Sequence, residues 1–151
     1  MKKPIERILV PVYYSEPAFH AAWIALAIAR SMQASMTLMH IHIQENALRE
    51  TIFIDPNALT GLTDEKFHDL LLKLVGDPSY KALQATADHS VIEFEPCSHT
   101  PSHEICDYAR ENKIDLIVMG SHCRSNIEEL LVGSVSFEVV RKAPCPVAVV
   151  H

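Results

Sequence analysis

Short runs rich in β-branched and other apolar residues alternate with segments of helical length along the 151-residue chain, and this alternation limits the fold more than any other feature. The pattern predicts five strands, over residues 7–12, 36–43, 91–96, 114–119 and 147–150. Helices are expected between them, at residues 16–32, 63–87, 102–111 and 134–142, with a break in the second from Gly76 to Ser79. This order is typical of a single open parallel α/β sheet with helices on both faces.

Composition excludes several classes of function. With 48% hydrophobic residues the chain can bury one core, so we expect a single domain over residues 1–151. A formal net charge of −6 gives no positive surface for nucleic acid or anionic lipid. The longest apolar run, residues 21–29, is far shorter than the roughly 20 residues of a membrane-spanning helix. Four cysteines without a C-x-x-C pair, and no recognisable export signal, predict a cytoplasmic chain with free thiols.

The segment from residue 44 to residue 62 carries turn chemistry, namely Asp55-Pro56-Asn57 and Gly61. We therefore expect a long surface loop there, of the kind that often covers a binding site.

A candidate anion site follows the fourth predicted strand. The pattern is that of a strand, a phosphate-sized loop and a helix start, over residues 118–125 and Gly133-Ser134-Val135-Ser136. Gly120 and Gly133 allow backbone N–H groups to approach a ligand closely, and the serines lie where a helix presents unpaired donors and a positive dipole. Turn geometry for the glycines and helix capping for the serines are alternatives that need no ligand.

Three segments of the chain resemble the universal stress protein family: Ile8-Leu9-Val10-Pro11-Val12, Leu116-Ile117-Val118-Met119-Gly120-Ser121, and Leu131-Val132-Gly133-Ser134-Val135 through Ala143-Pro144-Cys145-Pro146-Val147. The resemblance spans essentially the whole chain. It implies a Rossmann-like sheet of five parallel strands in the order 3-2-1-4-5, and a homodimer in which Val147–Val150 meets its symmetry mate. The apolar edge of that last strand favours a dimer independently, because an unpaired edge is a liability.

One branch of the family binds ATP through an Asp at the end of the first strand and a loop of the form Gly-x-x-Gly-(nine residues)-Gly-Ser/Thr. Gly120, Gly133 and Ser134 match this loop, but Cys123 stands where its second glycine belongs. A Cβ at that position can clash with a phosphate or forbid a positive φ. His99 stands in place of a further glycine before the third helix.

The end of the first strand departs from the ATP-binding branch as well. Tyr13 replaces the Asp and Tyr14 replaces the Gly commonly beside it, whereas the adenine contact near Ile41 needs only main-chain groups. The resemblance therefore implies an altered, weakened ATP pocket with adenine nucleotide as its candidate ligand. The candidate cofactor-binding residues are Val12, Tyr13, Tyr14, Ser15, Ile41, Gly120, His122, Cys123, Gly133, Ser134, Val135 and Ser136.

Two further hypotheses rest on histidines and cysteines. Five histidines lie near predicted strand ends or on the third helix: His40, His42, His99, His103 and His122. Imidazole groups together with the Cys123 thiolate would suit zinc or copper. The sequence has no compact metal-binding motif, so no metal is assigned. Cys123 beside Arg124 is also the candidate oxidant-sensing thiol.

No catalytic constellation with credible spacing is present, so we expect a weak ATPase at most and no enzyme. The main hypothesis is a stress-response binding or regulatory module with an altered nucleotide pocket. The alternative is a nucleotide-independent protein-interaction module whose pocket Tyr13 and Tyr14 close.

Overall fold

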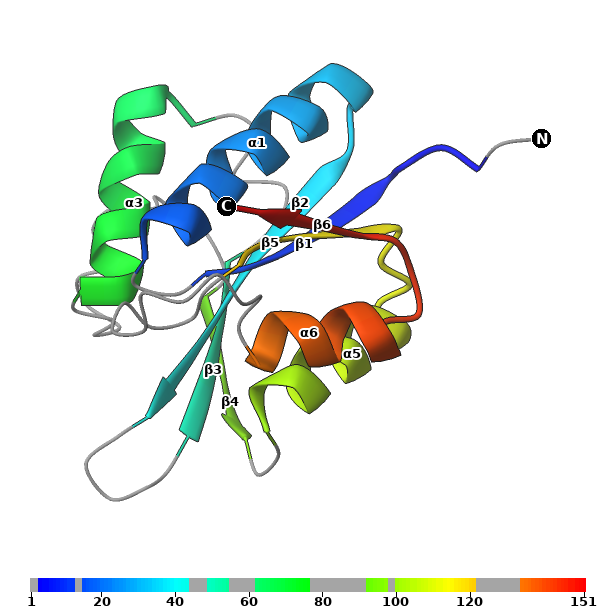
Figure 1. Ribbon diagram of the computed structural model, residues 1–151. Coiled ribbons are helices and arrows are strands. Elements are labelled where there is room, and N and C mark those ends of the chain that lie inside the picture. Colours follow the sequence, from blue (N-terminus) through cyan, green and yellow to red (C-terminus); the bar gives the residue numbers. More distant parts are fainter. Residues whose placement is uncertain are drawn as a thin grey trace.

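A computed structural model of the chain describes residues 3–12, 15–43, 49–54, 62–76, 92–97, 100–121 and 134–151 (Figure 1). Its strands form one sheet in the order β4-β3-β2-β1-β5-β6. The strands are β1 (Arg7–Pro11), β2 (Ser35–Ile43), β3 (Arg49–Ile54), β4 (Ile92–Cys97), β5 (Leu116–Gly120) and β6 (Val147–Val150). The helices are α1 (Glu16–Met32), α3 (Asp64–Gly76), α5 (Pro101–Glu111) and α6 (Ser134–Lys142).

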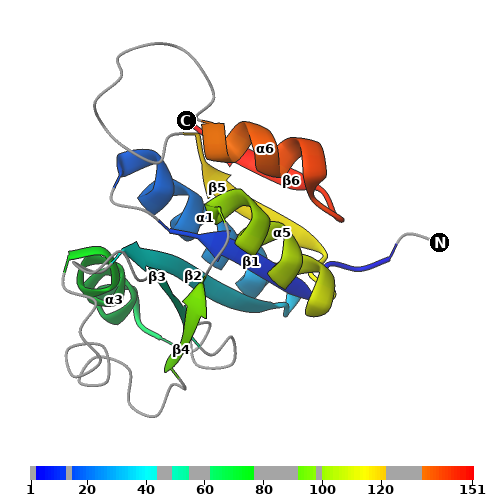
Figure 2. The same ribbon diagram turned by 90° about the horizontal axis from the view of Figure 1, so that it is seen from below.

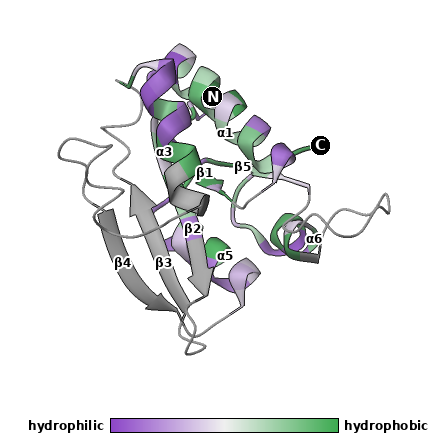
Figure 3. Cartoon of the chain, turned by 90° about the vertical axis from the view of Figure 1, so that its left-hand side faces the viewer, coloured by the Kyte–Doolittle hydropathy of each residue, from purple (hydrophilic) through white to green (hydrophobic). Residues whose placement is uncertain are grey.

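Helices cover both faces of the sheet, α1 and α3 on one face and α5 and α6 on the other (Figures 1 and 2). Because side chains alternate along a strand, Ile8 and Val10 of β1 face the α1 and α3 side while Leu9 faces the α5 and α6 side. Figure 3 shows that α1 and α3 carry both hydrophobic and hydrophilic residues, as expected of helices that pack through one face. The sheet therefore separates two apolar cores.

The central part of the sheet confirms the predicted parallel arrangement. β1 pairs in parallel with β2 on one side and with β5 on the other, and β6 extends the sheet in parallel beyond β5. These are the second, first, fourth and fifth predicted strands in the predicted order, with ends that agree to within about two residues. α3 is described as far as Gly76, the first residue of the predicted break. The predicted second piece, up to Ala87, lies outside the described residues.

At its other end the sheet differs from the prediction of five parallel strands. β3 lies inside the segment predicted as a loop, and it pairs antiparallel with β2 and with β4. The run Thr51-Ile52-Phe53-Ile54 has the β-branched and aromatic composition of a strand. Only residues 44–48 separate β2 from β3, which suits an antiparallel neighbour and is too short for a parallel crossover. The third predicted strand, β4, is therefore displaced from β2 to the edge of the described sheet.

α1 begins and ends at recognisable caps. The Ser15 side chain accepts a hydrogen bond from the Ala18 N–H, Pro17 stands in the first turn, and Gln33 ends the helix with φ of 56°. Its buried face is mostly alanine, which lets the helix lie close to β1 and β5. Within the described ranges, neither α1 nor another helix is long and apolar enough to cross a membrane.

Candidate functional site

The carboxyl ends of β1 and β5 lie side by side at the point where the strand order reverses. The chain passes from β1 to β2 on one side, whereas β5 joins β1 on the other. In open α/β sheets ligands bind in the crevice outside this reversal. The site is bounded by the start of α1, which follows β1, and by the start of α6 (Figure 2).

Gly120 ends β5 against the first turn of α1. A Cβ added to Gly120 lies 2.6 Å from the Ala18 nitrogen and 2.8 Å from the Pro17 carbonyl carbon. Both are backbone atoms that cannot rotate aside. The absence of a side chain at Gly120 is thus needed for close packing of β5 on α1, whether or not a phosphate binds nearby.

Ser15 caps α1 and satisfies donors that an anion would otherwise use. Its hydroxyl oxygen lies 3.2 Å from the Ala18 N–H, and its carbonyl accepts the Phe19 N–H. Pro17 has no N–H to offer, and Glu16 places a negative charge in the first turn. The start of α1 therefore has little remaining capacity for an anion.

The start of α6 has a different character. It begins at Ser134 as predicted and carries no acidic residue in its first turn. As at any helix N-terminus, its first backbone N–H groups have no partner within the helix, and the dipole favours an anion there. The Val135 side chain packs against the core beneath α5 and α6, so this residue can offer a ligand only its backbone.

Ser136 joins α6 to the end of β5. Its fully buried hydroxyl lies 2.9 Å from the Gly120 carbonyl oxygen and 3.1 Å from that of Ser121. Because carbonyl oxygens only accept, Ser136 donates its single proton to them. The Ser121 N–H in turn donates to the Val150 carbonyl of β6. Ser136 thus fixes the start of α6 against the end of β5. Its hydroxyl proton is used in these bonds and is not offered to a ligand.

Val12 is buried at the end of β1, and both of its main-chain groups are paired. Its N–H donates to the Met39 carbonyl, and its carbonyl oxygen lies 2.8 Å from Nδ1 of His40. Since Val12 offers an acceptor, Nδ1 of the buried His40 carries the proton. No local sequence signal indicates this contact, because it joins residues that are 28 positions apart.

Ile41 lies opposite Thr51 in the antiparallel pairing of β2 with β3. One edge of β2 is therefore occupied by β3 at the position predicted to contact adenine. The predicted order placed the third strand, residues 91–96, beside β2; the structure places β3 there instead.

The remaining candidate residues lie outside the described residues: Tyr13, Tyr14, His122, Cys123 and Gly133. The same is true of His99. The Ser134 side chain and that of His42 are likewise not described. In the part of the chain that the structure describes, no group of three His, Cys, Asp or Glu side chains has an arrangement that could hold a metal ion.

Two of the cysteines are free thiols beside α5 and α6. Burial raises the pKa of the Cys106 thiol above its ordinary value, and burial raises the pKa of Cys145 in the same direction. A raised pKa lowers the thiolate fraction, so these two thiols are unsuited to oxidant sensing.

Comparisons with known proteins agree with this arrangement. The universal stress protein MJ0531 of Methanocaldococcus jannaschii is 29% identical over 150 residues, which cover 96% of this chain and 81% of that protein. The solved structure of universal stress protein UspA from Lactobacillus plantarum has a TM-score of 0.61 at 26% identity, covering 99% of this chain and 100% of that one. A universal stress protein in complex with cAMP has a TM-score of 0.58 at 20% identity, covering 99% and 98%.

The sequence model of the universal stress protein family matches residues 4–151. The match includes the ends of β1 and β5 and the start of α6, from which the site is built. This chain belongs to the universal stress protein family.

Proposed function

We propose that this chain is a stress-response binding or regulatory module whose altered pocket binds adenine nucleotide weakly, with the phosphates at the start of α6. It binds without substantial hydrolysis of ATP. Membership of the universal stress protein family supports the stress-response role. The likeness to the cAMP complex, at 20% identity, supports the shared fold, so the nucleotide proposal rests on the residues of this chain.

The observation that carries the proposal is the position of the α6 N-terminus. Ser136 holds it against the carboxyl end of β5, beside the reversal of strand order, where its first N–H groups are directed toward the crevice end of the sheet. The first turn of α6 holds no acidic residue, so no side chain of that turn offsets the positive end of the helix dipole.

The same geometry supports a weakened site. At the start of α1, Ser15 accepts a backbone N–H and Glu16 offsets the helix dipole. The anion is therefore bound by the N-terminus of α6 alone, without that of α1. The chain also has Tyr13 where the ATP-binding pattern has an Asp, and Cys123 where it has a Gly. Loss of the Asp reduces ribose or metal contacts, and the Cβ of Cys123 crowds the phosphates, so the donors at the start of α6 provide the main phosphate contacts.

Isothermal titration of ATP tests this assignment on two proteins, the natural chain and the triple variant Tyr13→Asp, Tyr14→Gly, Cys123→Gly. Mass spectrometry first confirms that no nucleotide was co-purified. The natural chain is expected to bind weakly, and the variant at least about tenfold more tightly in the presence of Mg²⁺. His68→Asp, which adds the same charge on the exposed face of α3, is the control and should leave the affinity unchanged.

Absence of binding by the natural chain, with no gain in the folded triple variant, would contradict the proposal. The pocket would then be closed, and the function would be that of a nucleotide-independent interaction module.

We further propose a homodimer through β6 and a cytoplasmic location. β6 is the last strand of the described sheet beside β5, and its four residues are half-buried, so a second copy would pair its open edge. The free thiols of Cys106 and Cys145 are typical of a reducing compartment.

A further inference from the structure

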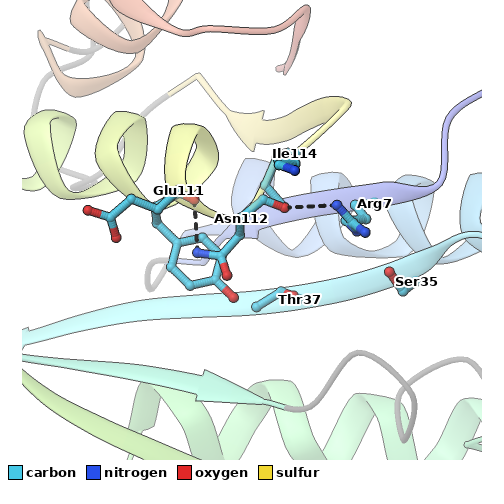
Figure 4. A pocket seen from close by; sticks show the side chains of 8 residues that line it. Arg7, Ser35, Thr37, Glu111, Asn112 and Ile114 are labelled. Carbon is cyan, nitrogen blue, oxygen red and sulfur yellow. Dashed lines mark hydrogen bonds between the residues drawn. The ribbon is translucent and has the colours of Figure 1, made fainter. Parts of the chain in front are cut away.

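A pocket lies beside the amino ends of β1 and β2, at the end of the sheet opposite to the candidate nucleotide site (Figure 4). Its volume is about 410 Å³, which is within the range of roughly 300 to 1,000 Å³ seen for small-molecule sites. Arg7 of β1 lies opposite Ser35 of β2 in the parallel pairing, and Thr37 follows on the same face. The end of α5 and the residues after it form the facing wall.

Thr37 lines this pocket with a buried hydroxyl. The residue is only 5% exposed, and among the residues that the structure describes its hydroxyl has no hydrogen-bond partner. A buried hydroxyl without a partner is costly, and nearly all such groups in native proteins are paired with protein, water or ligand. A binding pocket that adjoins this hydroxyl provides room for the missing partner.

The charged groups of the pocket are also largely unused. Arg7 donates one long hydrogen bond of 3.4 Å, to the Asn112 carbonyl, which leaves most of its guanidinium donors available in the described structure. Lys113 adds a second exposed positive charge, and within the described residues it takes part in no ion pair. Figure 4 shows the Glu111 carboxylate directed away from Arg7. Among the side chains that line the pocket, two cations and one remote carboxylate give an excess of positive charge, which favours an anion.

The uncharged residues of the pocket offer both apolar surface and a hydrogen-bond acceptor. The Tyr108 ring and Ile114 offer apolar surface, whereas Ser35 donates to the Glu6 carbonyl and keeps an acceptor for the pocket. We propose that this pocket binds a small organic anion that carries hydroxyl groups. The anionic group lies against Arg7 and Lys113, and an oxygen of the ligand accepts the Thr37 hydroxyl proton. This site is separate from the nucleotide site at the carboxyl ends of the strands.

The probe is sn-glycerol 3-phosphate, titrated into the ¹⁵N-labelled full chain, with uncharged glycerol as the matched ligand control. The expected result is a saturable shift of the amide signals of residues 35–37 and 111–114 with the phosphate ester and not with glycerol. Arg7→Gln, and independently Lys113→Gln, should raise the Kd several-fold to tenfold. Lys66→Gln, which removes an exposed lysine on α3, should leave the Kd unchanged.

Thr37→Val separates a ligand-binding hydroxyl from a structural one. Because the hydroxyl has no partner in the described structure, its replacement by a methyl group should leave the urea midpoint unchanged or raise it, while the Kd rises. A lowered midpoint with an unchanged Kd would show that ordered water satisfies the hydroxyl and would overturn the proposal. No saturation by about 10 mM, or shifts confined to the start of α6, would overturn it as well.

Discussion

Gly120 is the residue at which β5 approaches the first turn of α1, and its lack of a side chain is a packing requirement. Gly120→Ala should lower the free energy of unfolding by about 2 kcal/mol or more, because the new Cβ meets the backbone of Pro17 and Ala18. Urea unfolding followed by circular dichroism measures this. Ala18→Gly in the same chain should not restore stability, since the contact is with backbone atoms. Equal stability of Gly120→Ala and the natural chain would contradict the packing described for this site.

Asp115 holds the N-terminal segment against the start of β5. Its carboxylate is 8% exposed, forms an ion pair with Lys3, and accepts the N–H groups of Glu6 and Arg7 at 3.0 Å each. Burial alone would raise the pKa of Asp115, but hydrogen bonds from Lys3 and from two backbone N–H groups outweigh burial and lower the pKa below its ordinary value.

This lowered pKa makes the contribution of Asp115 dependent on pH. A carboxyl with a lower pKa in the folded chain stabilises it above the unfolded pKa of about 3.9, and that stability is lost as the pH falls through the folded pKa. Asp115→Asn should therefore lower the free energy of unfolding by about 1 kcal/mol at pH 7, and the difference should shrink below about pH 4. Urea unfolding at pH 7 and pH 3 measures both values; a difference that grows in acid would refute this account.

At the scale of elements, β3 is the part of the sheet that distinguishes this chain from a purely parallel fold. Thr51 lies at the centre of β3, between Ile41 of β2 and Glu95 of β4, so its N–H belongs to a hydrogen-bonded ladder. Thr51→Pro should cost about 3 kcal/mol, whereas proline in a surface loop would be tolerated. Thermal unfolding measures the cost, and a melting temperature equal to that of the natural chain would show that residues 49–54 do not form an inner strand.

In the described residues, the buried Ser136 hydroxyl links α6 to the end of β5. Ser136→Ala removes the hydrogen bonds to the Gly120 and Ser121 carbonyls, and we expect a loss of about 1 kcal/mol together with weaker ATP binding. Ser102→Ala on the partly exposed start of α5 is the control and should change neither. Unfolding in urea and titration of ATP give the two values. Unaltered affinity in a destabilised Ser136→Ala protein would mean that α6 does not hold the phosphates.

For the whole molecule, the proposed homodimer pairs β6 with a second copy. Val149→Lys places a charge on this strand and, if the chain dimerises through β6, should make it a monomer. Sedimentation velocity distinguishes the two states, and Ile24→Lys on the exposed face of α1 should remain dimeric. A natural chain that sediments as a monomer at all concentrations would contradict pairing through β6.

The parallel centre of the fold could be predicted from the sequence because its signals are local. The apolar runs of β1 and β5 and the Ser15 cap each depend on neighbouring residues. β3 was missed because Asp55-Pro56-Asn57 gave its segment the character of a loop, and its pairing with β2 depends on tertiary structure. The contact of Gly120 with α1 and the bond from His40 to Val12 join distant segments, so no local pattern could indicate them.

The proposed function requires that the α6 N-terminus hold the phosphates of a weakly bound adenine nucleotide. The most direct test is the ¹⁵N–¹H spectrum of the full chain during titration with ATP, repeated with adenosine. If backbone donors of α6 contact phosphate, the Ser134, Val135 and Ser136 amide signals should shift saturably with ATP and much less with adenosine. No saturable change at these amides, or equal changes with adenosine, would contradict it.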